Sequence, residues 1–261
     1  MYEFLTYIFP VKIEYAVLFL TRVLALISTA PLFTGSGGFN RYKMALGVAI
    51  TIVLMPAVKA PEWTGPSLGL AIIPFVAREF LVGALLGWII ACAFAGVRVA
   101  GELVTTEMGL NLSATLDPVS GTSSPVITTL YQTIAGLIFI TLGAHEWIVA
   151  GLAHSFHKIP VGTFDFGPDP IAGLIQILTR FIEAGVALAA PIMIAMFVVT
   201  VLLGVVSRAV PQLNILDSGY ALRVAAALGA LALLLPALRI GLESLFELMR
   251  SALFEALPGI Q

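Results

Sequence analysis

The chain consists of apolar segments separated by shorter polar stretches. Apolar residues dominate six segments, at about 15–33, 44–58, 68–97, 126–153, 174–206 and 219–242. A helix needs roughly 20 apolar residues to cross the hydrocarbon core of a bilayer. Segment 44–58 is shorter than this, whereas 68–97 and 174–206 are longer and are interrupted by Pro74 and Pro191. The pattern therefore predicts uneven, kinked helices that do not form a simple up-and-down bundle.

Composition places the chain among all-α membrane proteins. Of its 261 residues, 59% are hydrophobic and 11% are charged, whereas a typical soluble domain has about 25% charged residues. The net charge of −2 is uninformative, but no basic run marks a nucleic-acid surface, so we expect no nucleic-acid partner. Glu3 stands where a cleaved signal would carry basic residues, so we expect the first apolar segment to remain in the protein. The single cysteine, Cys92, excludes an intrachain disulfide.

The charges between the segments give no orientation in a membrane. Basic residues gather on the cytoplasmic side of conventional spans. Alternate loops hold four basic residues on each side: Arg41, Lys43, Arg98 and Arg208 against Lys12, Lys59, Lys158 and Arg250. Either the spans lie elsewhere, or the protein is not a conventional bundle.

Several charged residues lie within or at the edge of the apolar segments. They are Arg22, Arg78, Glu79, Arg180, Glu183, Arg223 and Arg239. An arginine at the centre of a membrane helix costs about 2.5–3.5 kcal/mol, so we do not expect all of them to face lipid. Helical spacing allows three pairs, Arg180–Glu183, Arg98–Glu102 and Arg239–Glu243. Arg22 and Arg223 have no such neighbour.

Three interpretations of these charges stay open. They pair helices within the chain, they form the ion relay of a transporter, or they contact other subunits and a water-filled lumen. Small residues also recur at four-residue spacing, as Gly83/Gly87, Gly96/Ala100 and Gly185/Ala189. This spacing predicts close helix packing, either inside the chain or between subunits.

The segment 103–125, LVTTEMGLNLSATLDPVSGTSSP, is too polar to span a membrane and too poor in charge for a solvated tail. Loops longer than about 12–15 residues are usually functional or disordered. In an extended conformation, Met108, Leu110 and Leu112 would share one side. Such a loop would close a water-filled path by an apolar constriction. The alternative is an ordered connector lying on the helices.

A second polar stretch, 207–219, separates the last two apolar segments, and its proline, Pro211, predicts a break between two helices. Three histidines, His145, His154 and His157, lie close to Trp147, which is more typical of a membrane interface than of a metal site. The chain has neither a GxSxG nor an HExxH motif. We therefore expect no enzyme, no cofactor and no metal.

Three stretches together resemble the FliR family of flagellar export-gate proteins and its injectisome counterparts. They are LTRVLALISTAPLF (20–33), GVRVAGELVTTEMGLNLSATLDPVSG (96–121) and SRAVPQLNILDSG (207–219). The specific combination is Arg22 with Pro31, Gly101-Glu102, Met108-Gly109-Leu110, Asp117-Pro118, Gly121 and Pro211-Gln212-Leu213-Asn214. The resemblance covers essentially the whole chain, in order.

The resemblance implies an all-α fold of kinked helical hairpins, forming one subunit of a helical, pseudo-symmetric export gate raised largely out of the bilayer plane. One copy of this chain would join five FliP-like and four FliQ-like subunits, beside an FlhB-like switch protein. The complex would sit in the bacterial inner membrane, at the centre of the flagellar basal body, and pass unfolded substrates. Residues 1–183 would be a FliP-like part, and 184–261 a FliQ-like hairpin with its tip at 207–218.

The resemblance also implies roles for particular residues. The pore would be closed by a plug, with Met108, Gly109, Leu110, Asn111, Leu112, Asp117, Pro118 and Gly121. Buried or subunit-contacting charges would be Arg22, Arg78, Glu79, Arg180, Glu183 and Arg223. The hairpin tip, with Arg208, Pro211, Gln212 and Asn214, would face the cytoplasmic entrance. The alternatives are an injectisome subunit, a secondary transporter that uses its intramembrane charges, and a membrane scaffold without a lumen.

Overall fold

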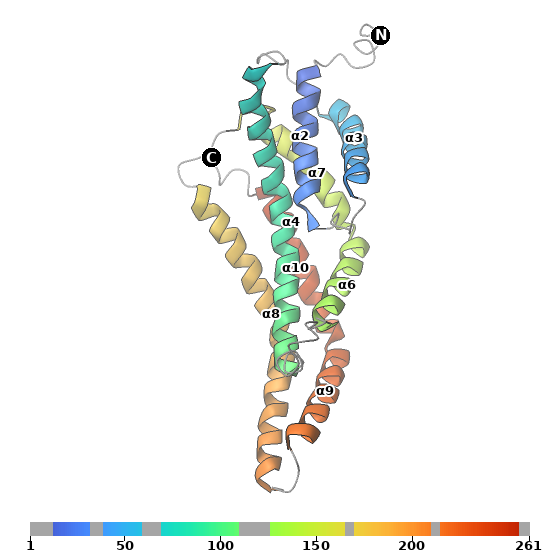
Figure 1. Cartoon of the computed structure of the whole chain (residues 1–261), viewed down its shortest axis with the longest axis vertical. Helices are drawn as coiled ribbons and strands as arrows, with labels where there is room; N and C mark the ends of the chain where they lie inside the picture. The colour runs from blue at the N-terminus through green and yellow to red at the C-terminus, as the bar shows by residue number, and fades with distance from the viewer. Residues whose placement is uncertain are drawn as a thin grey trace, which may run out of the picture. The chain divides into compact units, whose positions relative to one another are not determined.

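The structure, a computed structural model, describes residues 13–31, 39–58, 69–109, 126–164, 170–209 and 215–255, and these ranges contain helices and no strand (Figure 1). In chain order the helices are α2 (Ile13–Thr29), α3 (Phe39–Ala57), the short 3-10 helix η2 (Leu70–Ile72), α4 (Ile73–Met108), α6 (Val126–Thr141), α7 (Ala144–Lys158), α8 (Pro170–Ala209), α9 (Ile215–Leu233) and α10 (Leu235–Glu255). The predicted all-α fold is confirmed.

Within the described ranges, two helices are long and apolar enough to cross a membrane, over Leu70–Met108 and Ile171–Arg208. The number rises to four if α6 with α7, and α9 with α10, each count as one bent span. The membrane class predicted from composition is therefore confirmed, but the six apolar segments do not become six regular spans.

The chain folds into two compact units. Unit 1 comprises Met1–Cys92, His145–Ile177 and Met249–Gln261, and unit 2 comprises Ala93–Ala144 and Leu178–Leu248. The predicted boundary between 183 and 184 falls inside the continuous helix α8, and the division into FliP-like and FliQ-like parts stays a prediction.

The prediction that the long loop begins at Leu103 is wrong, because α4 continues to Met108. Ala100, Val104 and Met108 are buried at four-residue spacing, which is the period of a helix with one face against a core. The hydroxyl of Thr105 donates to the carbonyl of Gly101, four residues earlier. The polar threonines in this stretch therefore hide a helical pattern, and Met108 is not extended.

The last apolar segment is also longer than predicted. Instead of one segment over 219–242, α9 and α10 meet at Leu234 with a bend of 63°. Helix α10 extends well beyond Leu242 because an apolar stripe continues between its charged residues. The stripe consists of Leu238, Leu242, Leu245, Phe246, Met249 and Leu253, all buried.

The prolines act less uniformly than predicted. Pro74 is the second residue of α4, where a proline starts a helix without losing a hydrogen bond. Pro191 lies inside α8, which the structure gives as one helix. Pro74 therefore lies at the start of a helix and does not produce the predicted kink.

Unit 1 has an aromatic core between α2 and α7. The rings of Phe19 and Phe156 stack, with their centroids 3.8 Å apart and their planes within 7° of each other. Leu18, Val23 and Leu26 of α2 are buried beside them. The core of unit 1 thus forms along one face of α2.

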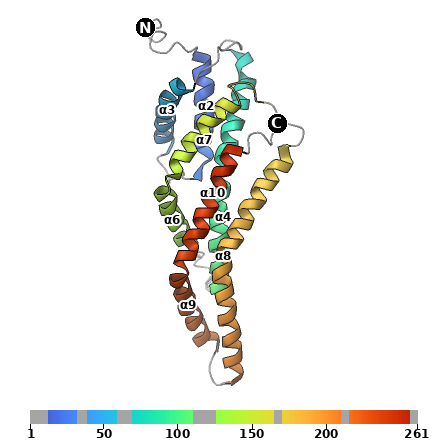
Figure 2. The same cartoon turned by 180° about the vertical axis from the view of Figure 1, so that it is seen from behind.

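Unit 2 has a second aromatic cluster, contributed by three helices. The ring of Phe94 on α4 lies 5.7 Å from Phe139 on α6 and 5.8 Å from Phe246 on α10. Phe139 meets Phe246 edge-on at 5.3 Å. In the same unit, α8 and α9 lie side by side in both views (Figures 1 and 2).

Helical glycines permit the closest approaches between helices. A Cβ built on Gly83 would lie 2.8 Å from the Cβ of Ala25 and would clash with the carbonyl of Arg22. A Cβ on Gly96 would lie 2.7 Å from the carbonyl of Phe181, and one on Gly185 would meet the backbone of Gly96 at 3.0 Å. The glycines of the predicted small-residue motifs therefore serve packing inside the chain.

Three other helical glycines have open space around them. A Cβ built on Gly136, Gly204 or Gly229 has no atom within 4 Å among the described residues. Glycine in a helix interior is about 1 kcal/mol less favourable than alanine. These positions therefore provide matched controls for the packed glycines.

We predict opposite outcomes for two alanine substitutions in α8. Gly185→Ala forces a side chain against the backbone of α4 and costs about 1–3 kcal/mol of unfolding free energy. Gly204→Ala adds a methyl group in open space and is neutral, or stabilises by up to about 1 kcal/mol. Thermal unfolding of the chain purified in detergent measures both, and an equal loss at the two positions would contradict the packing described here.

Candidate functional site

A fully buried ion pair joins α2 to α4 inside unit 1. Both side chains, Arg22 and Glu79, have 0% exposure. Arg22 Nε donates to Glu79 Oε2 at 2.6 Å, and Nη2 donates to Oε1 at 3.1 Å. This side-on, bidentate arrangement is the strongest geometry between a guanidinium and a carboxylate. The partner that Arg22 lacks nearby in the sequence is thus 57 residues away.

The remaining donors and acceptors of the pair are satisfied by α7 and the residues after it. Arg22 Nη1 donates to Ser155 Oγ at 3.3 Å, and both Nη atoms donate to the carbonyl of Ile159 at 3.1 Å. The backbone N–H of Gly162 donates to Glu79 Oε1 at 2.8 Å. Gly162 has φ 83°, a left-handed conformation that glycine adopts without strain.

The guanidinium of Arg22 also lies on an aromatic face. Its Cζ is 4.3 Å from the centroid of Phe156, within the range of a cation–π interaction. Tyr15 is 2% exposed, and burial, opposed by Arg22 and reinforced by Glu79, raises the pKa of its phenol. Both observations describe a site from which water is excluded.

The geometry favours a structural role for these two charges among the three interpretations. Removing two ions from water costs several kcal/mol per ion, which only close contact and full hydrogen bonding offset. Arg22 and Glu79 have both, and their partners come from α2, α4, α7 and the turn after α7. The cluster formed by Arg22, Glu79, Ser155, Ile159 and Gly162 therefore ties these elements together.

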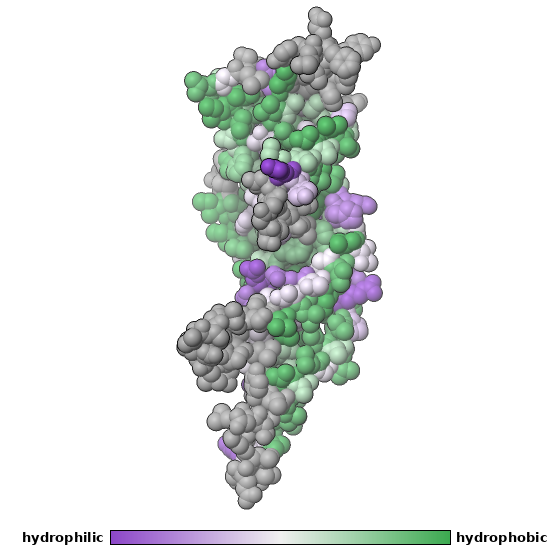
Figure 3. Space-filling view, turned by 45° about the vertical axis from the view of Figure 1, so that its right-hand side comes forward, coloured by the Kyte–Doolittle hydropathy of each residue, from purple (hydrophilic) through white to green (hydrophobic). Residues whose placement is uncertain are grey.

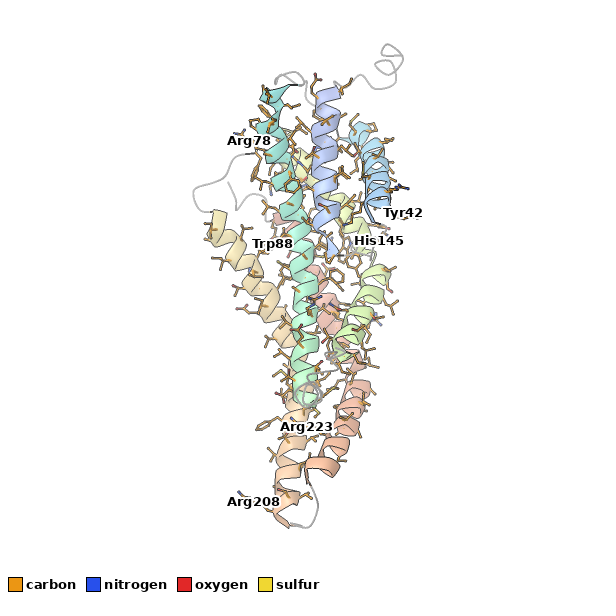
Figure 4. All side chains as sticks on the ribbon, viewed as in Figure 1. Tyr42, Arg78, Trp88, His145, Arg208 and Arg223 are labelled. Carbon is orange, nitrogen blue, oxygen red and sulfur yellow. The ribbon has the colours of Figure 1, made fainter. Side chains whose placement is uncertain are left out.

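Of the other predicted charges, Arg78, Arg180, Glu183 and Arg239 are exposed, and Arg223 is partly buried. Arg78 is exposed, with its guanidinium 6.0 Å from the ring of Phe75 (Figure 4). Of the three helical pairs predicted from spacing, Arg239–Glu243 is formed, at 2.8 Å. Arg180–Glu183 and Arg98–Glu102 are not paired, although all four residues are described and exposed.

Six charged residues lie near the contacts between three helices of unit 2. Gly96 of α4 abuts Phe181 of α8, and Gly241 of α10 abuts Leu188 of α8. Each of the three helices carries an arginine and a glutamate within two turns of such a contact. We call Arg98, Glu102, Arg180, Glu183, Arg239 and Glu243 the charged belt.

Helix α8, which carries two residues of the charged belt, also exposes large apolar side chains. Ile194, Phe197 and Val198 of α8 are 66%, 67% and 52% exposed. Figure 3 shows the same contrast on one face of the molecule, where hydrophobic residues cover most of the coloured surface and hydrophilic ones form small groups. Lipid tails would suit the aliphatic surface but not the charges.

The long loop begins in unit 2, at the end of α4. Helix α4 ends at Met108, which is fully buried, and Gly109 follows with φ 76°. A glycine in this conformation terminates many helices. Leu110, Asn111, Leu112, Asp117, Pro118 and Gly121 lie outside the described residues, so their role in a plug stays a prediction.

Glu107, which lies one turn before the loop, forms a long ion pair with Arg223 of α9, an arginine without an acidic neighbour at helical spacing. Its Oε2 lies 3.8 Å from Nη2 of Arg223. Of the hairpin tip, Arg208 is exposed at the end of α8 (Figure 4), whereas Pro211, Gln212 and Asn214 lie outside the described residues.

His154 takes part in ordinary packing, whereas His145 and His157 are exposed. The ring of His154 lies 5.4 Å from Phe254, and Arg250 stands 5.3 Å over the ring of Trp147. Among the described residues, no three histidine, cysteine or acidic side chains come together as metal ligands.

Sequence analysis missed the neutral members of the buried cluster. Ser155 and the carbonyl of Ile159 carry no signal at a distance of more than 130 residues from Arg22. Glu107 lay in the segment taken for a loop, so its helical position opposite α9 was hidden. Gly162 was the one member of the cluster whose residue type indicated a turn.

These features define an all-α membrane protein with an internally satisfied charge cluster and with further charges left exposed on long apolar helices. Residues 13–249 match the family described as bacterial export proteins, family 1. The chain is 33% identical to the flagellar biosynthetic protein FliR of Pectobacterium carotovorum subsp. carotovorum, over 92% of this chain and 89% of that protein.

Two further relatives carry the same description. Identity is 32% with the flagellar biosynthetic protein FliR of Escherichia coli (strain K12), over 87% of each chain. It is 29% with that of Bacillus subtilis (strain 168), over 92% of this chain and 93% of that protein. The chain belongs to the FliR family, and it is a membrane component of flagellar or type III protein export.

We predict that the buried pair tolerates no exchange of its charges. Arg22→Met leaves Glu79 buried and unpaired, which costs about 3–5 kcal/mol. The swap Arg22→Glu with Glu79→Arg does not rescue it, because the Ile159 carbonyl needs a donor and the Gly162 N–H needs an acceptor.

Thermal unfolding in detergent measures these variants. The control is Arg239→Ala, which removes a surface pair whose arginine is 72% exposed and which contributes about 1 kcal/mol or less. Recovery of stability in the swapped variant would contradict the hydrogen-bond network.

Proposed function

We propose that this chain is a core subunit of the flagellar type III export gate, completing a channel for unfolded substrates and helping to close it. FliP-like and FliQ-like subunits surround it, in the ratio of five to four to one copy of this chain, with an FlhB-like switch protein nearby. The site of action is the bacterial inner membrane at the centre of the basal body. The chain acts by assembly and gating and not as an enzyme.

One observation carries this proposal: the charged belt lies on helices that are otherwise suited to a membrane. Arg98 and Glu102 are exposed on α4, and Arg180 and Glu183 on α8. Both helices have the length and hydropathy of a span. Protein partners would accept both the belt and the aliphatic surface, and a water-filled lumen would accept the belt, whereas lipid tails would accept only the aliphatic surface.

The burial of α8 supports the same conclusion. Only 22% of its most apolar window is buried inside the chain, against 56% for α4. From Val201 onward, no described side chain of α8 is buried. A hairpin with so little internal packing needs neighbours, and FliQ-like hairpins with the same pattern would supply them.

The root of the loop supports a role in closure. Because Met108 is buried and Gly109 ends the helix, residues 110–125 start from a fixed point in unit 2. An apolar constriction of the pore would be formed by Leu110 and Leu112, with Asn111 between them, whereas the buried Met108 would fix the start of the loop. Asp117-Pro118 and Gly121 would return the chain.

The flagellar system is favoured over an injectisome because relatives described as flagellar match most of this chain.

The predicted hairpin tip begins in unit 2, where α8 ends and Arg208 is exposed. We place this tip, with Pro211, Gln212 and Asn214, toward the cytoplasmic entrance, where neighbouring tips would gather.

We predict that the chain purifies as one copy in a hetero-complex with a large excess of other subunits. Native mass spectrometry of the complex, extracted through an affinity tag on this chain, measures the composition. A monomer or a symmetric oligomer with coupled ion flux would instead indicate a secondary transporter, and the proposal would be wrong.

We also predict that the loop keeps the resting gate closed. Because α4 extends to Met108, a deletion of residues 110–115 removes loop residues and spares the helix. It should raise the ion conductance of the assembled complex in planar bilayers. Replacing 110–115 by glycine and serine of the same length separates loss of the apolar side chains from loss of length. Unchanged conductance in both variants, at normal complex yield, would exclude the plug.

A further inference from the structure

Helix α3 of unit 1 exposes a continuous apolar stripe. Met44, Val48 and Ile52 recur at four-residue spacing and are 59%, 42% and 52% exposed, and Val53 beside them is 70% exposed. Figures 1 and 2 show α3 at the edge of unit 1, next to α2, with no other described helix on its outer side. The stripe therefore faces the surroundings of the chain.

The opposite face of α3 is already used for packing. A Cβ built on Gly47 would lie 3.6 Å from the side chain of Ile27 on α2. Thr51 and Leu54 are buried on the same face. The hydroxyl of Thr51 donates to the carbonyl of Gly47 at 2.8 Å, so this polar group needs no water. Because both faces are apolar, turning the stripe inward would only expose the other one.

The charges of α3 lie at one end of the helix and have one sign. Arg41 is exposed and Lys43 is half-buried in the first turns, and no charged residue follows as far as Ala57. Tyr42, between them, projects from the outer side of the helix (Figure 4). Basic and tyrosine side chains at one end of an apolar segment are typical of a helix that meets a membrane, where their polar ends reach the headgroups.

The surface of α3 differs from those of the two long helices. Helix α4 exposes Arg98 with Glu102, and α8 exposes Arg180 with Glu183, among apolar side chains. Opposite charges within an apolar surface suit a protein partner. The described surface of α3 has cations at one end and aliphatic side chains along the rest, which is complementary to an anionic lipid with its phosphate at one end and acyl chains below.

The dimensions of the stripe match one leaflet. From Met44 to Val53 the helix rises about 15 Å, at 1.5 Å per residue. The hydrocarbon core of a bilayer is about 30 Å thick, so the stripe covers about half of it. In agreement with this, α3 is not among the helices that are long and apolar enough to cross a membrane.

We infer that the outer face of α3 is a lipid-binding surface. Acyl chains of one leaflet cover the apolar stripe, and the anionic headgroups bind Arg41 and Lys43. This goes beyond the proposed function, in which α8 and the charged belt meet other subunits. A gate raised largely out of the bilayer plane would still touch the membrane through this helix.

Fluorescence quenching tests which partner covers the stripe. In a full-length chain with Cys92→Ala, Val53→Cys carries a fluorescent label, and the assembled complex is placed in nanodiscs whose lipids bear bromine on their acyl chains. The label should lose about half of its fluorescence or more relative to unbrominated lipid, because it lies among acyl chains. Ile52→Cys provides a second labelled position on the same stripe.

Glu102→Cys, on the charged belt, is the matched control and should keep its fluorescence. Unquenched labels at both Val53 and Ile52 would show that lipid does not cover α3, and the inference would be overturned while the proposed function stands. Quenching at Glu102 would instead contradict the observation that carries the proposed function.

A second experiment tests the headgroup contact. The Val53 label is quenched by brominated phosphatidylglycerol, present as a minor component of phosphatidylcholine nanodiscs. Arg41→Gln with Lys43→Gln should weaken the preference for phosphatidylglycerol about fivefold for each charge removed. The exchange Arg41→Lys with Lys43→Arg keeps both charges and should keep the preference. Equal quenching in the neutral and the exchanged variants, with unchanged thermal unfolding, would overturn the binding of headgroups.

Discussion

An apolar protein buries a charged side chain only where every hydrogen-bond donor or acceptor of that side chain has a partner. The pair of Arg22 and Glu79 meets this condition with six hydrogen bonds, two between the two side chains and four to Ser155, Ile159 and Gly162. In a medium with few dipoles, the loss of any one leaves an ion without compensation. The positions of α2, α4 and α7 in unit 1 are therefore coupled, because each contributes a group that the others need.

Close backbone approach is the second half of the same constraint. The carbonyl of Arg22 lies against Gly83, one turn after Glu79. A larger residue at 83 would push α2 away from α4 and lengthen the contacts of the ion pair. The small-residue motif and the buried charges are thus one arrangement, in which glycine sets the distance that the guanidinium and carboxylate require.

Much of this arrangement was predictable from the sequence, but the pairing of Arg22 with Glu79 was not. The apolar segments and the composition indicated the fold class, and the spacing of Gly83, Gly96 and Gly185 indicated close helix packing, without deciding whether it lies inside the chain or between subunits. Arg22 was visible as a charge in need of a partner. Its partner was not, because residues 57 positions apart meet only through tertiary folding, and a carbonyl such as that of Ile159 has no sequence signature.

The end of α4 was predicted wrongly for a local reason. Thr105 and Thr106 make the stretch look polar, although their hydroxyls return to carbonyls of the preceding turn. The buried residues Val104 and Met108 keep the helical period beneath them. The candidate plug and the hairpin tip rest on family resemblance, since the physics of single residues does not distinguish a closing loop from a connector.

The bare surface of α8 has a consequence for how the cell handles this protein. A newly made copy that finds no neighbours shows chaperones and membrane proteases a helix whose most apolar window is only 22% buried. Quality control acts on such exposure, and marginal differences in burial change abundance several-fold. The steady-state level of this subunit should therefore follow the supply of whichever partner subunit is limiting. Copies made in excess should be degraded and should not accumulate unassembled.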